Sequence, residues 1–298
     1  MRQISCPVCH TFPPIAPESR SVHRCESCGV RWTFLPDEVN AEALYEDEVY
    51  AVVDNRRSIF ERIIFSEAKT VLRQALKLHP KINSLLDFGS GKGQFLAVAK
   101  EVGFEGLGIE TAKDRAGFAR EKYQVRVLGE YYSGGKIGQG NFDFITLNHV
   151  LEHLPDPIEL MQELLSQNLA SKGLVYIEVP RADSWQAKIA GADWMHWDIP
   201  KHLTHWTEAG LELEFSKIGF QRVGTRGFSV HLGVLGMLQA LLSKVGFNEN
   251  LILRLKRKKT PGLLILIGMV LPFAWGLEVI STGFGKSGIV GIYLRRNG

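Results

Sequence analysis

The chain has 298 residues, of which 45% are apolar and 22% charged, a composition typical of a soluble globular protein. These proportions exclude a disordered chain, a collagen-like chain and a protein with many membrane spans. Thirty-five basic residues against 32 acidic residues give a net charge of +3, which is too weak for a protein whose main task is to coat nucleic acid. The length allows one large domain, or a small domain joined to a larger one.

All four cysteines lie near the start of the chain, in two Cys-x-x-Cys pairs: Cys6 with Cys9, and Cys25 with Cys28. Fifteen residues separate the pairs, which matches the ligand spacing of a zinc ribbon with four thiolates. A module of residues 1–35 is too short for a stabilising core, so the metal would supply its folding energy. The alternative is two disulfides. No apolar run precedes Cys6, so we expect no secretory signal and a cytoplasmic protein, in which a structural zinc ion is favoured.

Residues 36–80 are expected to form an acidic connector followed by an amphipathic helix. Apolar residues recur every three or four positions from Asn55 to His79, and Pro80 ends the pattern. From residue 81 to residue 298, strand-like runs alternate with helical ones. The predicted strands are 84–88, 107–110, 125–128, 142–148 and 174–179, and the predicted helices between them are 95–102, 112–122 and 158–169. This alternation predicts an α/β fold with a parallel sheet covered by helices on both faces.

The end of the first predicted strand has the features of a nucleotide-binding corner. Asp87 precedes Gly89-Ser90-Gly91-Lys92-Gly93, at the strand-to-helix turn where doubly wound sheets bind nucleotides. Gln94 replaces the third glycine of the dinucleotide fingerprint, and the phosphate-loop sequence Gly-Lys-Ser/Thr is missing, so NAD and ATP fit less well. Glu110 closes the second strand, 21 residues after Gly89, where a carboxylate can accept both hydroxyls of an adenosine ribose.

This combination resembles the class I S-adenosylmethionine-dependent methyltransferases, over residues 82–225 and the C-terminal strand. The resemblance implies a Rossmann-like doubly wound sheet that binds S-adenosylmethionine (SAM). The cysteine spacing adds a small zinc ribbon before this sheet, and the apolar run near the C-terminus adds an apolar helical insertion. It also implies a set of cofactor contacts: the backbone of Gly89, Ser90, Gly91 and Gly93 at the methionine end, Asp87 at the amino group, Glu110 at the ribose, Glu130 at the adenine and Asn148 beside the methyl group.

Residues 148–157 read Asn-His-Val-Leu-Glu-His-Leu-Pro-Asp-Pro and resemble the segment after the fourth strand in the methyltransferase-23-like subgroup. We expect Glu152 and His153 to begin or brace the following helix. A divalent metal bound by His149, Glu152 and His153 is the alternative. The segment departs from the Asn/Asp-Pro-Pro-aromatic turn that is typical of adenine amine methylation, and the main domain has no cysteine for cytosine C5 chemistry.

Residues 181–206 hold four of the six tryptophans and three of the nine histidines, which predicts a lid over the carboxyl ends of the strands. The run Pro-Lys-His-Leu-Thr-His-Trp-Thr resembles the lid of the same subgroup, and also the histidine loop of sugar C-methyltransferases that carry an N-terminal zinc module. We expect His202 to be the catalytic base and His149 to be a second candidate. The expected substrate contacts are Trp194, His196, Trp197 and His205. The alternative is an irregular hydrophobic cover with satisfied histidines.

Near the C-terminus a basic cluster at 254–259 precedes the apolar run 262–280, in which Glu278 is the one charge. The run is long enough to span a membrane, but Pro272 divides it and residues 288–294 resemble the last strand of the sheet. We therefore expect an apolar helical insertion over 229–282, folded as a kinked hairpin or helix pair. Its residues 254–282 would contact anionic lipid, and packing on the domain or in a dimer is the alternative.

Taken together, these features predict a cytoplasmic SAM-dependent methyltransferase, peripheral on the inner face of the membrane. Its expected acceptor is a small molecule, a glycan or a lipid-linked intermediate, with methylation on oxygen, and the charge balance argues against nucleic acid. Three alternatives stay open: a ribosomal RNA methyltransferase with a zinc ribbon, a sugar C-methyltransferase, and a scaffold that binds SAM without turnover.

Overall fold

The computed structural model describes residues 2–15, 21–39, 54, 56, 58–247, 249–257 and 260–298. Most of the expected acidic connector, and the end of the basic cluster at 258–259, lie outside these residues. The chain divides into two compact units, each described by itself. The sheet unit consists of Val52–Val179, Ala209–Arg226 and Gly291–Gly298, and the ribbon unit of Met1–Ala51, Pro180–Glu208 and Gly227–Val290.

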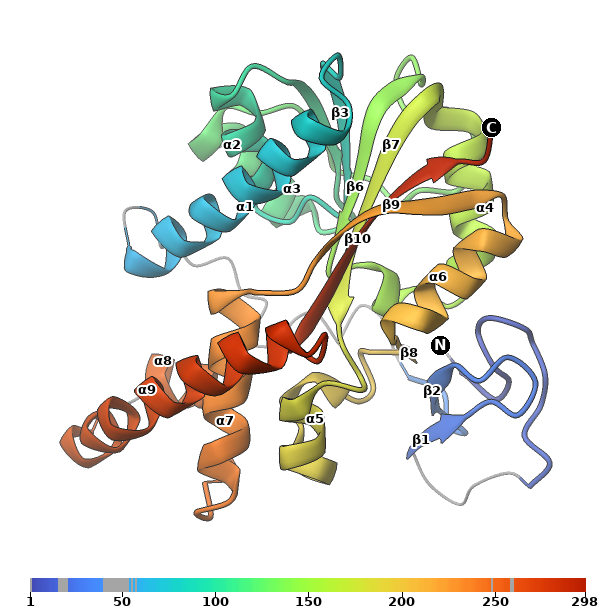
Figure 1. The fold of residues 1–298 in the computed structure, drawn as a ribbon. Helices are drawn as coiled ribbons and strands as arrows, with labels where there is room; N and C mark the ends of the chain where they lie inside the picture. Colours follow the sequence, from blue (N-terminus) through green and yellow to red (C-terminus); the bar gives the residue numbers. More distant parts are fainter. Residues whose placement is uncertain are drawn as a thin grey trace. The chain divides into compact units, whose positions relative to one another are not determined.

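A seven-stranded sheet with the order β5-β4-β3-β6-β7-β10-β9 forms the larger sheet of the protein (Figure 1). Its strands are β3 (Ser84–Phe88), β4 (Glu105–Ile109), β5 (Val127–Leu128), β6 (Phe142–Asn148), β7 (Leu169–Pro180), β9 (Phe220–Arg226) and β10 (Ile289–Arg296). The five strands from β3 to β7 are paired in parallel, whereas β10 pairs antiparallel with β9. The predicted α/β fold is confirmed. The sheet is mixed, because the unpredicted strand β9 brings an antiparallel pair to one edge.

Helices alternate with the strands of this sheet, as the sequence pattern predicts. They are α1 (Ile59–Leu78), α2 (Gln94–Glu101), α3 (Lys113–Phe118) with the π-helical turn η2 (Ala119–Tyr123), the 3-10 turn η3 (Leu151–His153), α4 (Pro157–Asn168) and α6 (Glu208–Lys217). Ser58 begins α1 by accepting a hydrogen bond from the Glu61 amide, and the helix ends two residues before Pro80. The apolar face of α1 is buried in one core with side chains of β3, β6 and β7, which fixes the orientation of the sheet's central strands.

In the ribbon unit a small sheet with the order β1-β2-β8 joins distant parts of the sequence. Strands β1 (Ser21–Arg24) and β2 (Arg31–Phe34) form an antiparallel hairpin, and β8 (Thr204–His205) pairs with β2. The helical elements of this unit are α5 (Trp185–Ala190), the 3-10 turns η4 (Gly191–Asp193) and η5 (Met195–Trp197), the π-helical turn η6 (Val230–Val234), α7 (Leu235–Ser243), α8 (Leu251–Arg257) and α9 (Pro261–Gly283).

The apolar run near the C-terminus forms one continuous helix, α9, and the expectation that Pro272 divides it is wrong (Figure 1). Proline removes one backbone donor and leaves the carbonyl four residues earlier without its helical partner. Here that carbonyl belongs to Gly268, and both residues lie on the exposed side of the helix. Packing against α7 on the other side holds the two halves of α9 together.

Candidate active site

In the glycine-rich loop between β3 and α2, other side chains pack against Gly89 and Gly93, whereas the space beside the central residue, Gly91, is empty. Gly89, Gly91 and Gly93 have φ values of 72°, 53° and 77°, a left-handed conformation that favours glycine. A Cβ on Gly89 would lie 2.4 Å from Val150 Cγ2, and a Cβ on Gly93 would lie 2.7 Å from Ala119 Cβ. A Cβ on Gly91 would meet nothing within 4 Å. A ligand can therefore approach the main chain at Gly91.

Glu110 lies directly beyond β4 and is joined to this loop. Its Oε2 accepts a hydrogen bond of 2.8 Å from the Gly91 amide, and its Oε1 accepts one of 2.9 Å from the Ala112 amide. The side chain is buried, so the two amides hold the carboxylate in one orientation. Thr111 Oγ1 also donates to Oε1, at the long distance of 3.5 Å. Oε2 therefore keeps a second lone pair for a ligand hydroxyl, and on Oε1 this weak contact is all that a ligand hydroxyl would displace. The structure thus brings together Glu110 and the open glycine.

Asp87 is the fourth residue of β3 and lies near the carboxyl end of this strand, just before the glycine-rich loop. Its Oδ1 accepts hydrogen bonds from Thr146 Oγ1 at 2.8 Å and from Asn148 Nδ2 at 3.4 Å. In the described part of the chain no donor reaches Oδ2. Burial raises the pKa of Asp87 to about 7. A cationic ligand group at Oδ2 would compensate for this burial, and Asn148 is already held beside the carboxyl.

Ser90 and Glu130 complete the set of predicted cofactor residues. The Ser90 side chain is buried, and its Oγ would lie 2.6 Å from a Cβ placed on Gly108, so it packs towards β4. The Ser90 amide donates to the Ile109 carbonyl oxygen at 3.0 Å, so the backbone group that can still accept a hydrogen bond from a ligand is the Ser90 carbonyl oxygen. Glu130 lies two residues beyond β5 and is exposed. Its predicted contact with adenine is not tested by the structure.

His149 follows β6 in a left-handed conformation, with φ of 55°. Its Nε2 lies 3.1 Å from Glu178 Oε1, and its Nδ1 lies 3.5 Å from Glu152 Oε1. Burial alone would lower the pKa of His149, but the two carboxylates outweigh it and raise the pKa to about 9. The ring is therefore an imidazolium at neutral pH and has no lone pair with which to abstract a proton.

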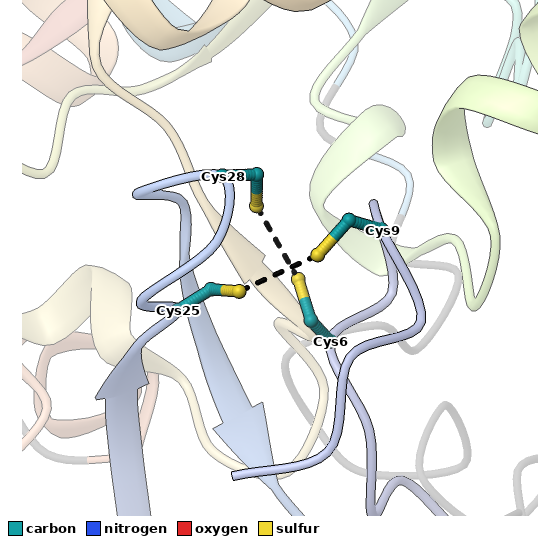
Figure 2. Close-up of side chains that lie close together, drawn as sticks. All are labelled: Cys6, Cys9, Cys25 and Cys28. Carbon is teal, nitrogen blue, oxygen red and sulfur yellow. Dashed lines mark hydrogen bonds between the residues drawn. The ribbon is translucent and has the colours of Figure 1, made fainter.

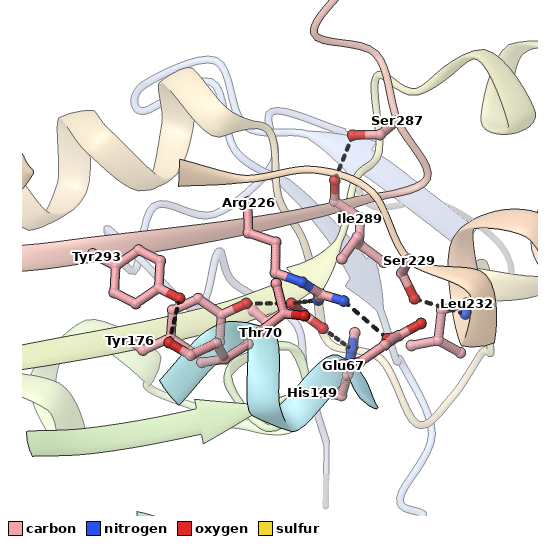
Figure 3. Close-up of polar contacts among 12 residues, drawn as sticks. Glu67, Thr70, His149, Tyr176, Arg226, Ser229, Leu232, Ser287, Ile289 and Tyr293 are labelled. Carbon is pink, nitrogen blue, oxygen red and sulfur yellow. Dashed lines mark hydrogen bonds and ion pairs between the residues drawn. The ribbon is translucent and has the colours of Figure 1, made fainter. Parts of the chain in front are cut away.

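Glu178 is the centre of a charged cluster that sequence analysis did not find. Its partners His149, Tyr176 and Arg226 are labelled in Figure 3. Arg226, the last residue of β9, donates to Glu178 and also to Glu67 Oε2 of α1, the latter at 2.9 Å. Tyr176 also donates to Glu178. Burial opposes ionisation of Glu178, but the Arg226 charge outweighs it and holds the pKa of Glu178 well below its usual range. The one signal in the sequence was an acidic residue near the end of an apolar strand.

In the ribbon unit, hydrogen bonds fix the ring of His202. Its Nδ1 lies 2.8 Å from the His196 carbonyl oxygen, so Nδ1 carries a proton and donates it, and its Nε2 lies 3.9 Å from Asp198 Oδ2. Thr33 of β2 donates to the His202 carbonyl oxygen at 2.6 Å, and its hydroxyl lies 2.8 Å from His205 Nε2. The predicted lid is therefore anchored on the small N-terminal sheet, and in the neutral ring of His202 the nitrogen that can accept a proton is Nε2.

The four residues expected to contact substrate pack against one another. Trp194 makes edge contacts with His196 and Trp197, and Trp197 makes one with His205. Trp194 is buried and donates from Nε1 to Gln186 Oε1 at 3.3 Å. These contacts give the segment a rigid aromatic core. Their role towards a substrate stays a prediction.

The four cysteines converge at the end of the β1–β2 hairpin (Figure 2). The sulfur atoms of Cys6 and Cys28 lie 3.6 Å apart, those of Cys9 and Cys25 lie 3.4 Å apart, and all four are within 4.8 Å of one another. A tetrahedral site with Zn–S bonds of about 2.3 Å needs sulfur atoms about 3.8 Å apart. A disulfide needs about 2.05 Å, and all four cysteines are free. The cluster is therefore a candidate metal site.

The sheet order, the antiparallel edge pair, the glycine loop after the first parallel strand and the acid after the second together define the class I methyltransferase fold. A model of the methyltransferase-23 family, described as a methyltransferase domain, matches residues 60–224. This is more than half of the chain, and the chain belongs to this family. The protein is a SAM-dependent methyltransferase.

Solved structures show the same fold at low sequence identity. The plantazolicin methyltransferase BpumL in complex with SAH is 16% identical, over 87% of this chain and 94% of that chain, with a TM-score of 0.53. A putative sarcosine dimethylglycine methyltransferase from Galdieria sulphuraria is 18% identical, over 78% of this chain and 85% of that chain, with a TM-score of 0.50. No curated protein matches the chain.

Proposed function

We propose that this protein transfers the methyl group of SAM to an oxygen atom of a small-molecule, glycan or lipid-linked acceptor, with His202 as the base. The observation that carries the cofactor assignment is the hydrogen bond between the Gly91 amide and Glu110. It ties an oriented carboxylate to the one glycine of the loop at which a side chain would enter open space. This pairing suits a ligand with a ribose and a polar tail.

The residues of this corner fit SAM in three respects. Glu110 offers a fixed pair of acceptors to the two ribose hydroxyls. The unpaired Oδ2 of Asp87 offers a counter-charge to the amino group, whose positive charge would favour the ionised carboxylate. The open backbone at Gly91 lets the ligand come close without steric conflict. When bound, SAM supplies an electrophilic methyl group on a sulfonium.

The proposed role of His202 follows from its tautomer. The His196 carbonyl oxygen holds the proton on Nδ1, so Nε2 can accept the proton of an acceptor hydroxyl as its oxygen bonds to the methyl carbon and the carbon–sulfur bond breaks. The proton would end on Nε2 and leave to water. His149 is not suited to this step at neutral pH, since the two carboxylates keep its ring protonated.

We also propose that the four cysteines bind one structural Zn²⁺. Four thiolates fill a tetrahedral shell and leave no open position for a substrate or a catalytic water. The ion would hold the β1–β2 hairpin, to which β8 is paired. Metal binding would in this way stabilise the backbone that carries His202, without taking part in the chemistry.

A matched pair of glycine variants tests the cofactor site. Gly91→Ala and Gly103→Ala both place alanine in a left-handed conformation, with nothing within 4 Å of the new Cβ. Both should lose about 1–2 kcal/mol of stability to backbone strain. Calorimetry with SAM and with its demethylated product should show affinity reduced at least about tenfold for Gly91→Ala and for Glu110→Gln, corresponding to about 1.4 kcal/mol or more. Gly103→Ala should bind normally, and normal binding by Gly91→Ala would show that the assignment is wrong.

The acceptor class and the base are tested by methyl transfer from labelled SAM to lipid, glycan, small-molecule and RNA fractions of a cell extract. We expect label in one of the first three fractions, with an alkali-resistant ether or an alkali-labile ester as the product. His202→Ala should bind SAM normally and transfer at least about a hundredfold more slowly, as expected for the loss of a general base. Label confined to RNA, or full activity in His202→Ala, would contradict the proposal.

A further inference from the structure

Helix α9 exposes a long apolar surface. It has 23 residues, which corresponds to a length of about 35 Å. Its most apolar window has a mean hydropathy of 2.3, and 11% of that window is buried. The large apolar side chains that are exposed on α9 and the residue after it are Leu264, Ile265, Met269, Phe273, Trp275, Val279, Ile280 and Phe284. A soluble helix that packs on one side normally carries polar residues on the other.

The opposite side of α9 is already packed. Leu263 and Ala274 are buried in a cluster with Met237 and Leu238 of α7. Glu278, the one charged residue of α9, is also on this side, fully buried, and its Oε1 accepts a hydrogen bond of 2.8 Å from the Gly288 amide. The single charge is therefore turned inward. The exposed side of α9 carries no charged residue. Trp275 lies against Phe228 and Phe284 stacks on Trp185, yet these two side chains stay 44% and 71% exposed.

The strand connections exclude a single crossing of a membrane by α9. The chain leaves the sheet after Arg226 of β9 and returns to it in β10, where Gly291 pairs with Arg226. Both ends of the excursion are therefore on the same side of any bilayer, and a crossing would need a second crossing to return. Among the described helices α9 is the one that is both long and apolar enough to cross a membrane, since the apolar stretch Val230–Ser243 is too short. An apolar helix that cannot cross can still lie in the plane of the surface.

The charge next to α9 matches an anionic surface. From Lys244 to Gly283 the sequence has six basic and two acidic residues, a net charge of +4. Since the whole chain carries +3, the rest of it carries −1. Basic residues beside an interfacial helix bind anionic lipid headgroups. A protein partner would need no such concentration of one sign of charge.

We propose that α9 is a membrane-docking helix that lies parallel to the bilayer, with its exposed side in the headgroup and acyl boundary of one leaflet rich in anionic lipid. The aromatic residues Phe273 and Trp275 anchor it at this boundary. The net charge of +4 over residues 244–283 favours attachment to anionic headgroups. Docking of this kind is independent of which acceptor is methylated.

The test uses the full chain and vesicles of phosphatidylcholine with or without phosphatidylserine. Ile265, Met269 and Phe273 are 58–71% exposed on α9, and Ile59, Tyr131 and Leu213 are 50–76% exposed elsewhere. Replacing the first three with serine should reduce flotation with vesicles at least about tenfold, whereas serine at the second three should leave it unchanged. Binding should need phosphatidylserine and weaken with added salt. Normal SAM affinity in both triple variants separates this result from any failure of the cofactor site.

Four outcomes would overturn the proposal. The α9 variant could float as well as the unaltered protein, or the unaltered protein could fail to bind either vesicle. Sedimentation could instead show a dimer that the α9 substitutions dissociate, which would assign the exposed side to a second copy of the chain. A C-terminal tag that becomes protected from protease when vesicles are added from outside would show a crossing, because an in-plane helix leaves the tag accessible.

Discussion

The charge on His149 can be tested through the stability of the protein against pH. The pKa of the ring in the folded protein is about 9, against an ordinary value of 6.5, because Glu152 and Glu178 outweigh the effect of burial. A group whose pKa is raised by folding stabilises the protein fully below its unfolded pKa and loses that contribution as the pH rises through the folded pKa. His149 should therefore stabilise the protein at pH 6.5 and contribute nothing above about pH 10.

The size of the contribution follows from the shift. A difference of about 2.5 pKa units corresponds to about 3 kcal/mol, at 1.36 kcal/mol per unit. The ring is about three-quarters covered, so solvent screening does not remove the effect. Asn is the best replacement, since it accepts the left-handed conformation that His149 has, with φ of 55°. His149→Asn thus removes the charge without adding backbone strain.

Urea unfolding at intervals between pH 6.5 and pH 10 measures this effect. At pH 7 His149→Asn should be about 3 kcal/mol less stable than the unaltered protein, and the two free energies of unfolding should converge as the pH approaches 10. The difference between the curves removes contributions from other titrating groups, which both proteins share. Curves that stay parallel over the whole range would show that the ring is neutral in the folded protein and that the carboxylates do not hold a proton on it.

Three further predictions concern the ribbon unit. Burial raises the pKa of Glu278 to about 7, so the protein should lose about 3 kcal/mol of stability as the pH rises from 4.5 to 7; Glu278→Gln should abolish that slope in urea unfolding. A Cβ on Gly288 would lie 1.4 Å from Gln186 Nε2. Gly288→Ala should therefore lower the thermal midpoint by the equivalent of about 2 kcal/mol. Adding Gln186→Ala should restore part of this stability if the conflict is with the Gln186 side chain. Atomic absorption should find one zinc per chain, and Cys25→Ser should lose it together with the chain's resistance to proteolysis in the first 35 residues; retained zinc would contradict the proposed ligand set.

The parallel part of the sheet was predictable because its signals are local. Each strand from β3 to β7 is a short apolar run next to a helix with a 3.6-residue period, so the order of elements follows from neighbouring residues alone. The glycine loop and Glu110 were found for the same reason. A strand-to-helix turn and the end of the next strand meet at one edge of any doubly wound sheet.

The charged cluster around Glu178 was not predictable, because its members are far apart in the sequence. Arg226 reaches Glu178 across 48 residues and Glu67 across 159. It does so from β9, a strand with three basic or amide side chains and a glycine, which has no apolar alternation to reveal it. The pairing of β8 with β2 is hidden in the same way, since two residues in a lid give no periodic pattern.

The three glycines of the loop look equivalent in the sequence, but in the structure they are required for different reasons. At Gly89 and Gly93 a Cβ would collide with Val150 and with Ala119, so these positions are required by packing whether or not a ligand is present. At Gly91 a Cβ would meet nothing within 4 Å, so a side chain there would conflict with a bound ligand and not with the protein, apart from the strain of the left-handed backbone. Substitutions at the first two should therefore act on folding and cofactor affinity together. Substitution at Gly91 should reduce affinity and cost only the backbone strain of about 1–2 kcal/mol that Gly103→Ala also costs, so comparison with Gly103→Ala separates the effect on binding from the effect on folding.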